Sequence, residues 1–448
     1  MTQASASTSA RPTGPGGPAD AVPEVAIVAQ HASLEFGGEA ALPFHFFRVL
    51  RKRGVGARLV VHERCRDAVA GAFPDDLDRV VFVPDRAIHR LLWRVGSVLP
   101  GRVAAMTTDT LLTLVTQWQL RRAARDLIRD HGVGLVHQPI PVSPKAPSLI
   151  GGLGVPVIIG PMNGGMDFPD AFRGYDGAAT RLLYQVGRRA SWLAHRLIPG
   201  KLRADALLVA NRRTALALPS GARGEVIELV ENGVDLDVWD APDDPRPDSD
   251  RDGLPRFAFL GRLVDWKAVD LLLEAFARVV AQAPALLEIL GDGPMRPSLE
   301  EKARGLGLIG GDGPDRVEFL GWQPQAECSR RLSRADALVL PSLYECGGAV
   351  VLEAMAMARP VVATDWGGPA DYLDPSCGIL VPPDSREGFV SGLASAMLRL
   401  AGDPDLRRRM GAAGRRKVVD QYAWDRKAEA ILAIYARVAS RAPGRPVG

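Results

Sequence analysis

Short apolar runs alternate with longer amphipathic runs along most of the chain, and this alternation constrains the fold more than any other feature. Runs such as EVAIVA (24–29), RFAFLG (256–261) and ALVLPS (337–342) are each followed by a longer stretch with helical spacing. Strands that alternate with helices form βαβ units, and these build parallel sheets covered by helices. The pattern predicts an α/β fold with doubly wound sheets.

A segment rich in Pro and Asp, DAPDDPRPDSDRDGLP, interrupts the alternation, which restarts directly after it. Such a composition is typical of a surface loop or domain connection. We therefore expect two Rossmann-like domains that face a cleft, over 21–235 and 256–418, joined by a linker over 236–255. The cleft is the expected ligand site, because open α/β sheets bind ligands at the carboxyl ends of their strands.

The two ends of the chain differ in composition from these domains. Residues 1–20 are rich in Ser, Ala, Gly and Pro, cannot bury apolar surface, and are expected to form a disordered tail. A last helix is expected over 419–440 and to cross back to the N-terminal domain.

Charge and cysteine content narrow the class of protein. The 55 Lys+Arg and 52 Asp+Glu leave a net charge of +3, too little for a nucleic-acid partner. Residues 21–235 hold 27 basic and 20 acidic residues, so the N-terminal half is expected to face something anionic. The 4 cysteines form no CxxC pair, which argues against disulfides and zinc and favours the cytoplasm. We find neither a signal peptide nor an apolar run of the roughly 18 residues that a membrane span needs.

The most informative stretch, PSLYECGGAVVLEAMAMARPVVATDWGGPADYLD (341–374), places Glu345 and the Gly347-Gly348 pair between a strand and a helix. Glycines ahead of a helix N-terminus let backbone N–H groups approach a phosphate, which the helix dipole also favours. Glu353, in the second turn of that helix, can project toward the same ligand as Glu345. One carboxylate would then accept hydrogen bonds from sugar hydroxyls and the other from a ribose diol. The alternative is two solvated glutamates.

A second constellation, FLGRLVDWKAVDLLLEAF (259–276), places Arg262 and Lys267 directly after a strand. Cations at the carboxyl end of a strand are well placed to neutralise a diphosphate leaving group, since Arg binds two oxygens and Lys acts as a point charge. The alternative is a pair of ordinary surface cations. The matching Gly-helix anion site in the same domain favours the diphosphate interpretation.

These residues belong to an ordered set of motifs that resembles a retaining GT-B glycosyltransferase of family 4. The resemblance is strongest over 225–438 and extends more weakly to the N-terminal half. The motifs that carry it are EX7E (Glu345 to Glu353), GRL…K (261–267), LGDGP (290–294), VEFLG (317–321), VENGVD (230–235), YAWDRKAEAILAIY (422–435), FGGEAALPFHFFRVLRKRG (36–54) and LVHQP (135–139).

On the C-terminal domain, the resemblance implies a role for each matching residue. Glu353 would hold the ribose of a nucleotide, and Glu345 would contact the donor sugar. Arg262 with Lys267 would bind the diphosphate, and Gly347 with Gly348 would form the loop on the phosphate side. The chain departs from the pattern at Ala268, where many members have Gly, and at Cys346-Gly347-Gly348, where many have an aromatic-Gly pair.

On the N-terminal domain, Gly37 and Gly38 would lie opposite the phosphate loop, and His137 would reach the sugar. A satisfied structural histidine is the alternative for His137. GPMNGGM (160–166) also follows a strand, so its glycines and Asn163 could line an acceptor pocket, with a plain turn as the alternative.

The expected mechanism needs neither a metal nor another cofactor, because cationic side chains stabilise the charge that builds on the diphosphate. No carboxylate of the N-terminal domain can be assigned as a nucleophile, so the retention implied by the resemblance is most simply front-face attack assisted by the leaving phosphate. Asp-x-Asp pairs occur at Asp235/Asp237 and Asp248/Asp250. We interpret them as chance matches to a Mg²⁺ motif.

The basic stretch 181–205 places Leu and Arg residues at near-helical spacing. Such a helix can lie on an anionic membrane surface and bring the enzyme to a lipid-linked acceptor. A helix docked on the sheet with a solvated Arg face is the alternative.

Together these observations predict a cytoplasmic retaining glycosyltransferase, peripheral on the inner face of the plasma membrane if 181–205 binds it. It would move a sugar from a nucleoside diphosphate to a hydroxyl acceptor, in cell-surface polysaccharide or glycolipid synthesis. The alternatives are a GT-B isomerase or phosphorylase, and a non-catalytic module that binds nucleotides or sugars. The expected partners are a nucleotide sugar and a sugar or lipid-linked acceptor, without nucleic acid.

Overall fold

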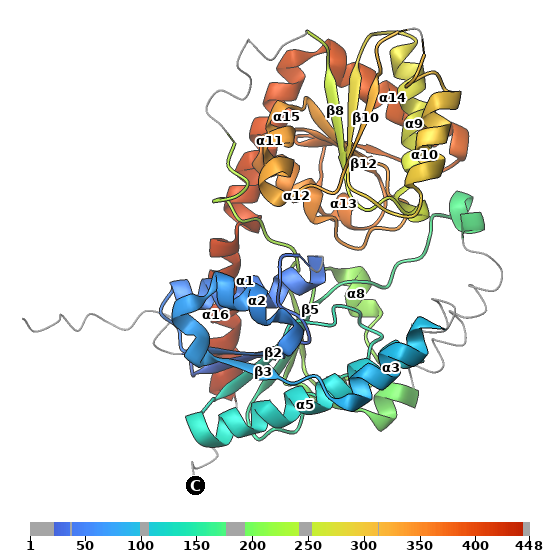
Figure 1. Ribbon diagram of the computed structural model, residues 1–448. Helices are drawn as coiled ribbons and strands as arrows, with labels where there is room; N and C mark the ends of the chain where they lie inside the picture. Colours follow the sequence, from blue (N-terminus) through green and yellow to red (C-terminus); the bar gives the residue numbers. More distant parts are fainter. Residues whose placement is uncertain are drawn as a thin grey trace, which may run out of the picture.

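The computed structural model describes residues 22–35, 38–98, 107–175, 193–241, 253–311 and 313–441. Within them the chain forms two parallel sheets, one of seven and one of six strands, each with helices packed against it. Figure 1 shows the two domains stacked, with the N-terminal domain below. The predicted α/β class and the pair of Rossmann-like domains are confirmed.

The N-terminal sheet has the strand order β3-β2-β1-β4-β5-β6-β7. Its inner strands are Val, Ile and Leu runs buried on both faces, as parallel strands between helical layers require. The strands are β1 (Val25–Val28), β2 (Ala57–His62), β3 (Val80–Val83), β4 (Leu135–Gln138), β5 (Val157–Met162), β6 (Ala206–Val209) and β7 (Glu225–Glu228). The helices are α1 (Gly38–Lys52), α2 (Arg66–Ala72), α3 (Ala87–Ser97), α5 (Thr108–His131), α7 (Gly200–Arg203) and α8 (Arg212–Leu216).

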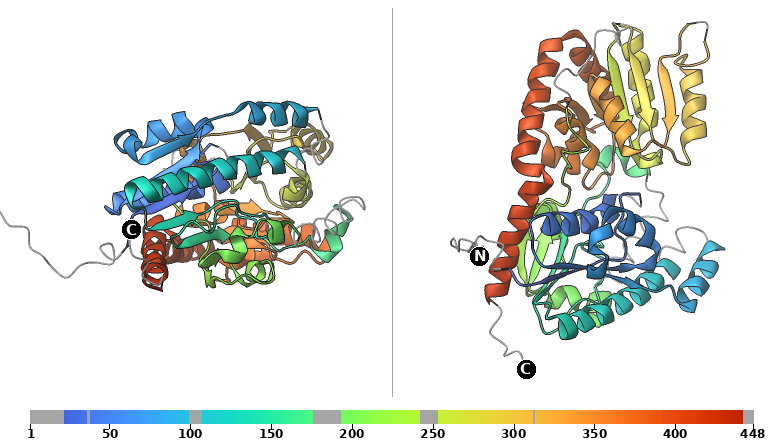
Figure 2. Two further views of the ribbon diagram at one scale, coloured as in Figure 1. Left: turned by 90° about the horizontal axis from the view of Figure 1, so that it is seen from below. Right: turned by 60° about the vertical axis from the view of Figure 1, so that its left-hand side comes forward.

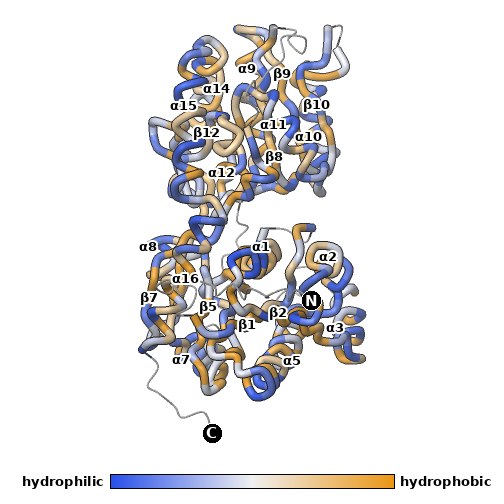
Figure 3. The backbone as a smooth tube through the Cα atoms, turned by 90° about the vertical axis from the view of Figure 1, so that its left-hand side faces the viewer, coloured by the Kyte–Doolittle hydropathy of each residue, from blue (hydrophilic) through white to orange (hydrophobic). Residues whose placement is uncertain are grey.

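The C-terminal sheet has the strand order β10-β9-β8-β11-β12-β13 and a single large core. Figure 3 shows hydrophobic segments along its strands, between more hydrophilic stretches of helix. The strands are β8 (Arg256–Leu260), β9 (Leu286–Leu290), β10 (Val317–Gly321), β11 (Ala337–Leu340), β12 (Val361–Thr364) and β13 (Gly378–Val381). The helices are α9 (Val269–Val280), α10 (Arg296–Gly305), α11 (Gln325–Arg334), α12 (Ala349–Ala356), α13 (Gly368–Tyr372), α14 (Arg386–Gly402) and α15 (Pro404–Lys417).

The last helix, α16 (Trp424–Arg441), returns to the N-terminal domain after a π-helical turn, Val418–Tyr422. It runs alongside the N-terminal sheet (Figure 2), and its buried side chains, such as Ile431 and Tyr435, join the core that includes α1 and β1. The segment that leaves the N-terminal domain at Val234 lies beside the segment that returns at Trp424, since Trp424 N–H donates to the Val234 carbonyl over 3.0 Å. Among the described helices, none combines the length and apolar character needed to cross a membrane.

Candidate functional site

The loop that carries Glu345 connects β11 to α12 at the carboxyl edge of the C-terminal sheet. Gly348 has a φ of 87° immediately before α12, a conformation that glycine adopts at least cost. Gly347 is buried, and a Cβ there would lie 2.2 Å from Glu231 Oε1 and 2.4 Å from Asn232 Nδ2. A side chain at Gly347 would require the Glu231 carboxyl and the Asn232 amide to move out of their hydrogen-bonded positions.

Lys267 forms an ion pair with Glu345 in this loop. Lys267 ends a short 3-10 helix (Asp265–Lys267) that follows β8, and β8 pairs with β11, so the two loops leave the sheet at the same edge. Both side chains are 16% exposed and thus remain accessible from solvent. A phosphate at the Gly347-Gly348 turn would offer Lys267 a second anionic partner.

The other residues of the Lys267 loop follow from its tight path. Ala268 is fully buried with a φ of 52°, so it holds a left-handed conformation that favours glycine. Arg262 is exposed directly after β8 and forms no ion pair within the part of the chain that the structure describes. Its guanidinium is therefore available to an anion at the same sheet edge.

Glu353 lies in the second turn of α12 and is half-buried. Burial raises the pKa of its carboxyl to about 7, and no opposing charge lowers it. Among the described residues, no group donates a hydrogen bond to this carboxyl. A partly desolvated carboxylate without a donor is suited to accept hydrogen bonds from the diol of a ligand.

Asn163 reaches the Glu345 loop from the N-terminal domain. It follows β5, and its Nδ2 donates to the Cys346 carbonyl over 2.8 Å and to Glu231 Oε1 over 2.7 Å. Asn163 therefore spans the two domains at the loop that carries Glu345.

Glu231, which the sequence reasoning did not single out, lies at the centre of this network. It is 5% exposed, and burial raises the pKa of its carboxyl. Its Oε1 also accepts from Asn232 Nδ2 over 2.9 Å, whereas its Oε2 is buried and has no hydrogen-bond partner among the described residues. Its place in the VENGVD motif, beside the Asn232-Gly233 pair, was the only sequence signal for it.

Further polar contacts hold the two domains together around Asn163. Asp371 on α13 accepts hydrogen bonds from Asn211 Nδ2 and from Arg213 Nη2, each over 2.9 Å. Trp366 Nε1 donates to the Asp167 carbonyl over 2.9 Å. Loops at the carboxyl edges of the two sheets therefore contact each other directly through hydrogen bonds.

His137 is the exception, and its position corrects the prediction that it reaches the sugar. It lies within β4, paired with Ile27 and Ile158, and is fully buried. Its Nε2 is 2.5 Å from the Gly160 carbonyl, and its Nδ1 is 2.6 Å from the Tyr435 hydroxyl of α16. With both nitrogens hydrogen-bonded in the core, His137 connects α16 to the N-terminal sheet.

Three other predicted features lie partly outside the described residues: the Gly37-Gly38 pair, the Asp-x-Asp pairs and the basic stretch 181–205. Gly38 is the first residue of α1 and has open space beside it, while Gly37 lies outside the described residues. In the first Asp-x-Asp pair, the Asp235 carboxylate forms an ion pair with Arg48. The second pair, Asp248/Asp250, lies outside the described residues. Of 181–205, only 193–205 is described.

We expect Gly347→Ala to disturb the contact between the two domains. The added Cβ would overlap the Glu231 carboxyl and the Asn232 amide, so thermal stability should fall by about 1–3 kcal/mol, and any activity that needs the closed arrangement should be lost. Gly71→Ala is the matched control, because a Cβ at Gly71 on α2 meets no atom within 4 Å. Equal melting temperatures for the two variants would contradict the tight packing at Gly347.

The family model of glycosyl transferases group 1 matches residues 254–403. The alpha-maltose-1-phosphate synthase of Mycolicibacterium smegmatis is 34% identical over 248 residues, which cover 50% of this chain and 63% of that protein. The D-inositol 3-phosphate glycosyltransferase of Streptomyces bingchenggensis is 32% identical over 231 residues, covering 48% of this chain and 49% of that protein. The chain thus spans between about half and 63% of these two relatives' own length.

Solved structures resemble the whole chain in fold. Sucrose-phosphate synthase from Thermosynechococcus elongatus has a TM-score of 0.64 at 18% identity and covers 93% of this chain and 99% of its own. The HepE protein of Anabaena, in complex with UDP, has a TM-score of 0.62 at 15% identity and covers 92% of this chain and 100% of its own. Residues 254–403 of the C-terminal domain therefore match the glycosyl transferases group 1 family, and the two domains together have the GT-B fold.

Proposed function

We propose that this protein is a retaining glycosyltransferase of family 4, which transfers a sugar from a nucleoside diphosphate to a hydroxyl acceptor. The observation that carries the proposal is the Lys267–Glu345 pair beside the Gly347-Gly348 turn, with Arg262 at the same sheet edge. One solved GT-B neighbour supports the choice of donor class, since structures of HepE hold UDP and UDP-glucose. Cell-surface polysaccharide or glycolipid synthesis is the pathway that we propose.

The proposed role of each side chain follows from its position in the site. Arg262 and Lys267 neutralise the diphosphate as the bond to the sugar breaks, and the α12 N-terminus adds its dipole. Glu345 orients the sugar, and Glu353 accepts hydrogen bonds from the ribose. The leaving phosphate takes the proton of the attacking hydroxyl on the same face, so that the configuration is retained. Because side chains supply the positive charge, transfer should persist in EDTA.

Donor hydrolysis tests the proposal directly. The purified protein is first screened with UDP, GDP, ADP and CDP, since a ligand that binds only the folded form raises the melting temperature. Nucleotide sugars of the stabilising base are then incubated with the protein, and release of the diphosphate is measured. Binding without any cleavage, even slow cleavage by water, would favour a non-catalytic binding module.

The carboxyl of Glu353 predicts a pH dependence of nucleotide binding. Its pKa of about 7 in the free protein means that most molecules carry it protonated at pH 6 and ionised at pH 8. Because the ionised form accepts hydrogen bonds from the ribose diol, affinity should rise about tenfold between these two values of pH. Isothermal titration calorimetry at both pH values, on the wild type and on Glu353→Gln, measures this change in affinity. The variant corrects for the protonation of the nucleotide's own phosphate. An identical pH profile in both proteins would contradict this role.

We also propose a cytoplasmic location with contact to an anionic membrane through 181–205. In the described part of this stretch, Leu193 is 51% and Leu197 is 73% exposed, with Arg196 between them. Co-sedimentation with anionic vesicles that weakens as salt rises would support this contact.

A further inference from the structure

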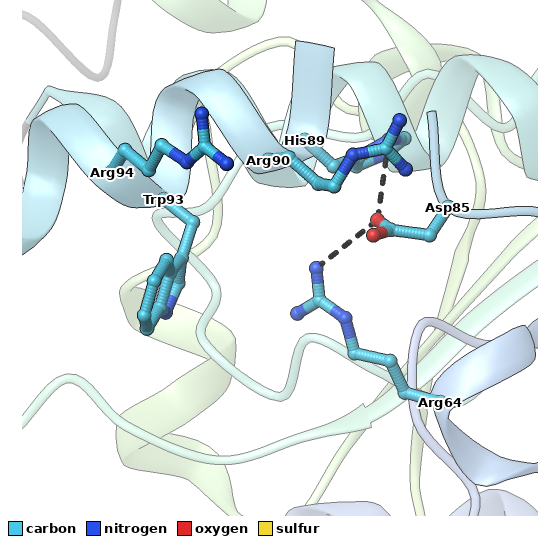
Figure 4. Close-up of a pocket in the computed structure, with 6 residues that line it drawn as sticks. All are labelled: Arg64, Asp85, His89, Arg90, Trp93 and Arg94. Carbon is cyan, nitrogen blue, oxygen red and sulfur yellow. Dashed lines mark ion pairs between the residues drawn. The ribbon is translucent and has the colours of Figure 1, made fainter. Parts of the chain in front are cut away.

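A hollow of about 480 Å³ lies on the N-terminal domain, away from the loops around Asn163 (Figure 4). It is formed by α3, by the start of the segment after β2 and by the loop after β3. Strands β2 and β3 are at one edge of the sheet, whereas Asn163 follows β5, three strands from β2. The residues that line the hollow are Arg64, Asp85, His89, Arg90, Trp93 and Arg94.

The hollow carries an excess of positive charge. Asp85 is its single carboxylate, and Arg64 pairs with it over 3.5 Å. Arg90 and Arg94 are exposed, one turn apart on α3, and neither has an ion-pair partner among the residues that the structure describes. Two guanidiniums with unused donors, beside a third, match the oxygens of a phosphate group better than any neutral ligand.

A metal ion is the competing occupant, because His62, Asp85 and His89 have ligand atoms within 4.8 Å of one another. His89 is already used on both sides: its Nδ1 accepts from Arg86 N–H over 3.0 Å, and its Nε2 lies 3.2 Å from the Thr116 hydroxyl. The Asp85 carboxylate faces Arg64. His62 Nε2 lies 3.8 Å from Asp85 Oδ1 and has no hydrogen-bond partner among the described residues. The nearby guanidiniums would repel a cation. The arrangement therefore favours an anion.

The rest of α3 indicates what the phosphate is attached to. Trp93, which lines the hollow, is 66% exposed and offers an aromatic face. Next to the arginines, four apolar side chains at helical spacing are also exposed: Ile88 by 41%, Leu91 by 57%, Val95 by 44% and Val98 by 81%. An aromatic and aliphatic surface beside a cationic hollow suits a phosphate ester that carries a sugar or a lipid chain.

We propose that this hollow, centred on Arg90 and Arg94, binds the phosphate group of a phosphorylated acceptor, either a soluble phosphate ester or a lipid phosphate. The inference rests on the proposed transferase function. It adds to that function the class of acceptor, recognised on the N-terminal domain beyond the carboxyl ends of β2 and β3. The uneven charge of the chain, basic over 21–235, agrees with an anionic ligand on this domain.

The test compares Arg90→Ala/Arg94→Ala with a matched control, Arg409→Ala/Arg416→Ala. The control pair is also exposed, on α15 of the other domain, and its removal changes the net charge equally. Binding of inorganic phosphate is measured by calorimetry, and binding of phosphatidylcholine vesicles with and without phosphatidylglycerol by co-sedimentation. We expect at least about tenfold weaker binding of one or both probes in the α3 variant, and no change in the control.

The two probes separate the possible sources of the phosphate. Loss of phosphate binding alone identifies a soluble ester, and loss of binding to the anionic vesicles identifies a lipid phosphate. Equal binding of both probes by the α3 variant and the control would overturn the proposal. Donor hydrolysis on the same preparations tests the transferase function separately. If the donor is cleaved but the Arg90/Arg94 variant binds both probes normally, only the proposed acceptor site is wrong. If the variant binds a probe more weakly but the donor is never cleaved, only the proposed transferase function is wrong.

Discussion

Replacing Lys267 by alanine should lower kcat/KM for the nucleotide sugar by about 10²–10³-fold, the cost typical of removing one preorganised group that stabilises transition-state charge. The ammonium lies on the strand edge next to the Gly347-Gly348 turn, where the diphosphate is proposed to leave, and its present partner is Glu345. Affinity for the free nucleoside diphosphate should fall as well, because the same charge contacts the ground state. Steady-state kinetics and calorimetry measure the two effects.

The fold should survive this substitution. The side chains of Lys267 and Glu345 are each 16% exposed, so water can take the place of the ammonium beside the Glu345 carboxylate. Lys52→Ala is a suitable control, since Lys52 is 62% exposed on α1 and pairs with Asp425 over 3.8 Å. If Lys267→Ala turned over at the wild-type rate, the assignment of Lys267 to the site would be wrong. A greatly lowered melting temperature would instead indicate a structural role for Lys267.

The fold could be predicted from sequence because its signal is local. Runs such as VAIV (25–28) and ALVL (337–340) are buried on both faces of parallel sheets, and each is followed by an amphipathic helix. The positions of Glu345, Lys267 and Glu353 were predictable for the same reason, since Glu345 and Lys267 follow strands and Glu353 lies in the second turn of the next helix. The contact between Lys267 and Glu345 then follows from the pairing of β8 with β11.

The residues between the domains were harder to predict, because their surroundings come from distant parts of the chain. His137 was expected to reach the sugar, but it is buried in β4, and its partner Tyr435 is 298 residues away on the returning helix α16. Glu231 sits in a turn that reads as a plain connection, and only the approach of Asn163 and Gly347 makes it part of the site. No periodicity in the sequence encodes such contacts.

Replacing Glu345 by alanine should abolish transfer to a similar degree, about 10²-fold or more, yet leave nucleotide binding intact. In the free protein the Glu345 carboxylate neutralises Lys267. Its removal frees that ammonium for the diphosphate, so affinity for the nucleoside diphosphate should stay equal or rise, whereas contact with the sugar is lost.

The contrast between the two variants distinguishes binding of the diphosphate from positioning of the sugar. In Lys267→Ala both the affinity for the diphosphate and the rate of cleavage fall, and in Glu345→Ala only the rate falls. Glu345→Gln keeps the size and the hydrogen-bonding oxygen but not the charge, and it should recover part of the rate if Glu345 accepts a hydrogen bond from a sugar hydroxyl. If Glu345→Ala weakened diphosphate binding as much as Lys267→Ala does, the carboxylate would be acting through the lysine, and its assignment to the sugar would be wrong.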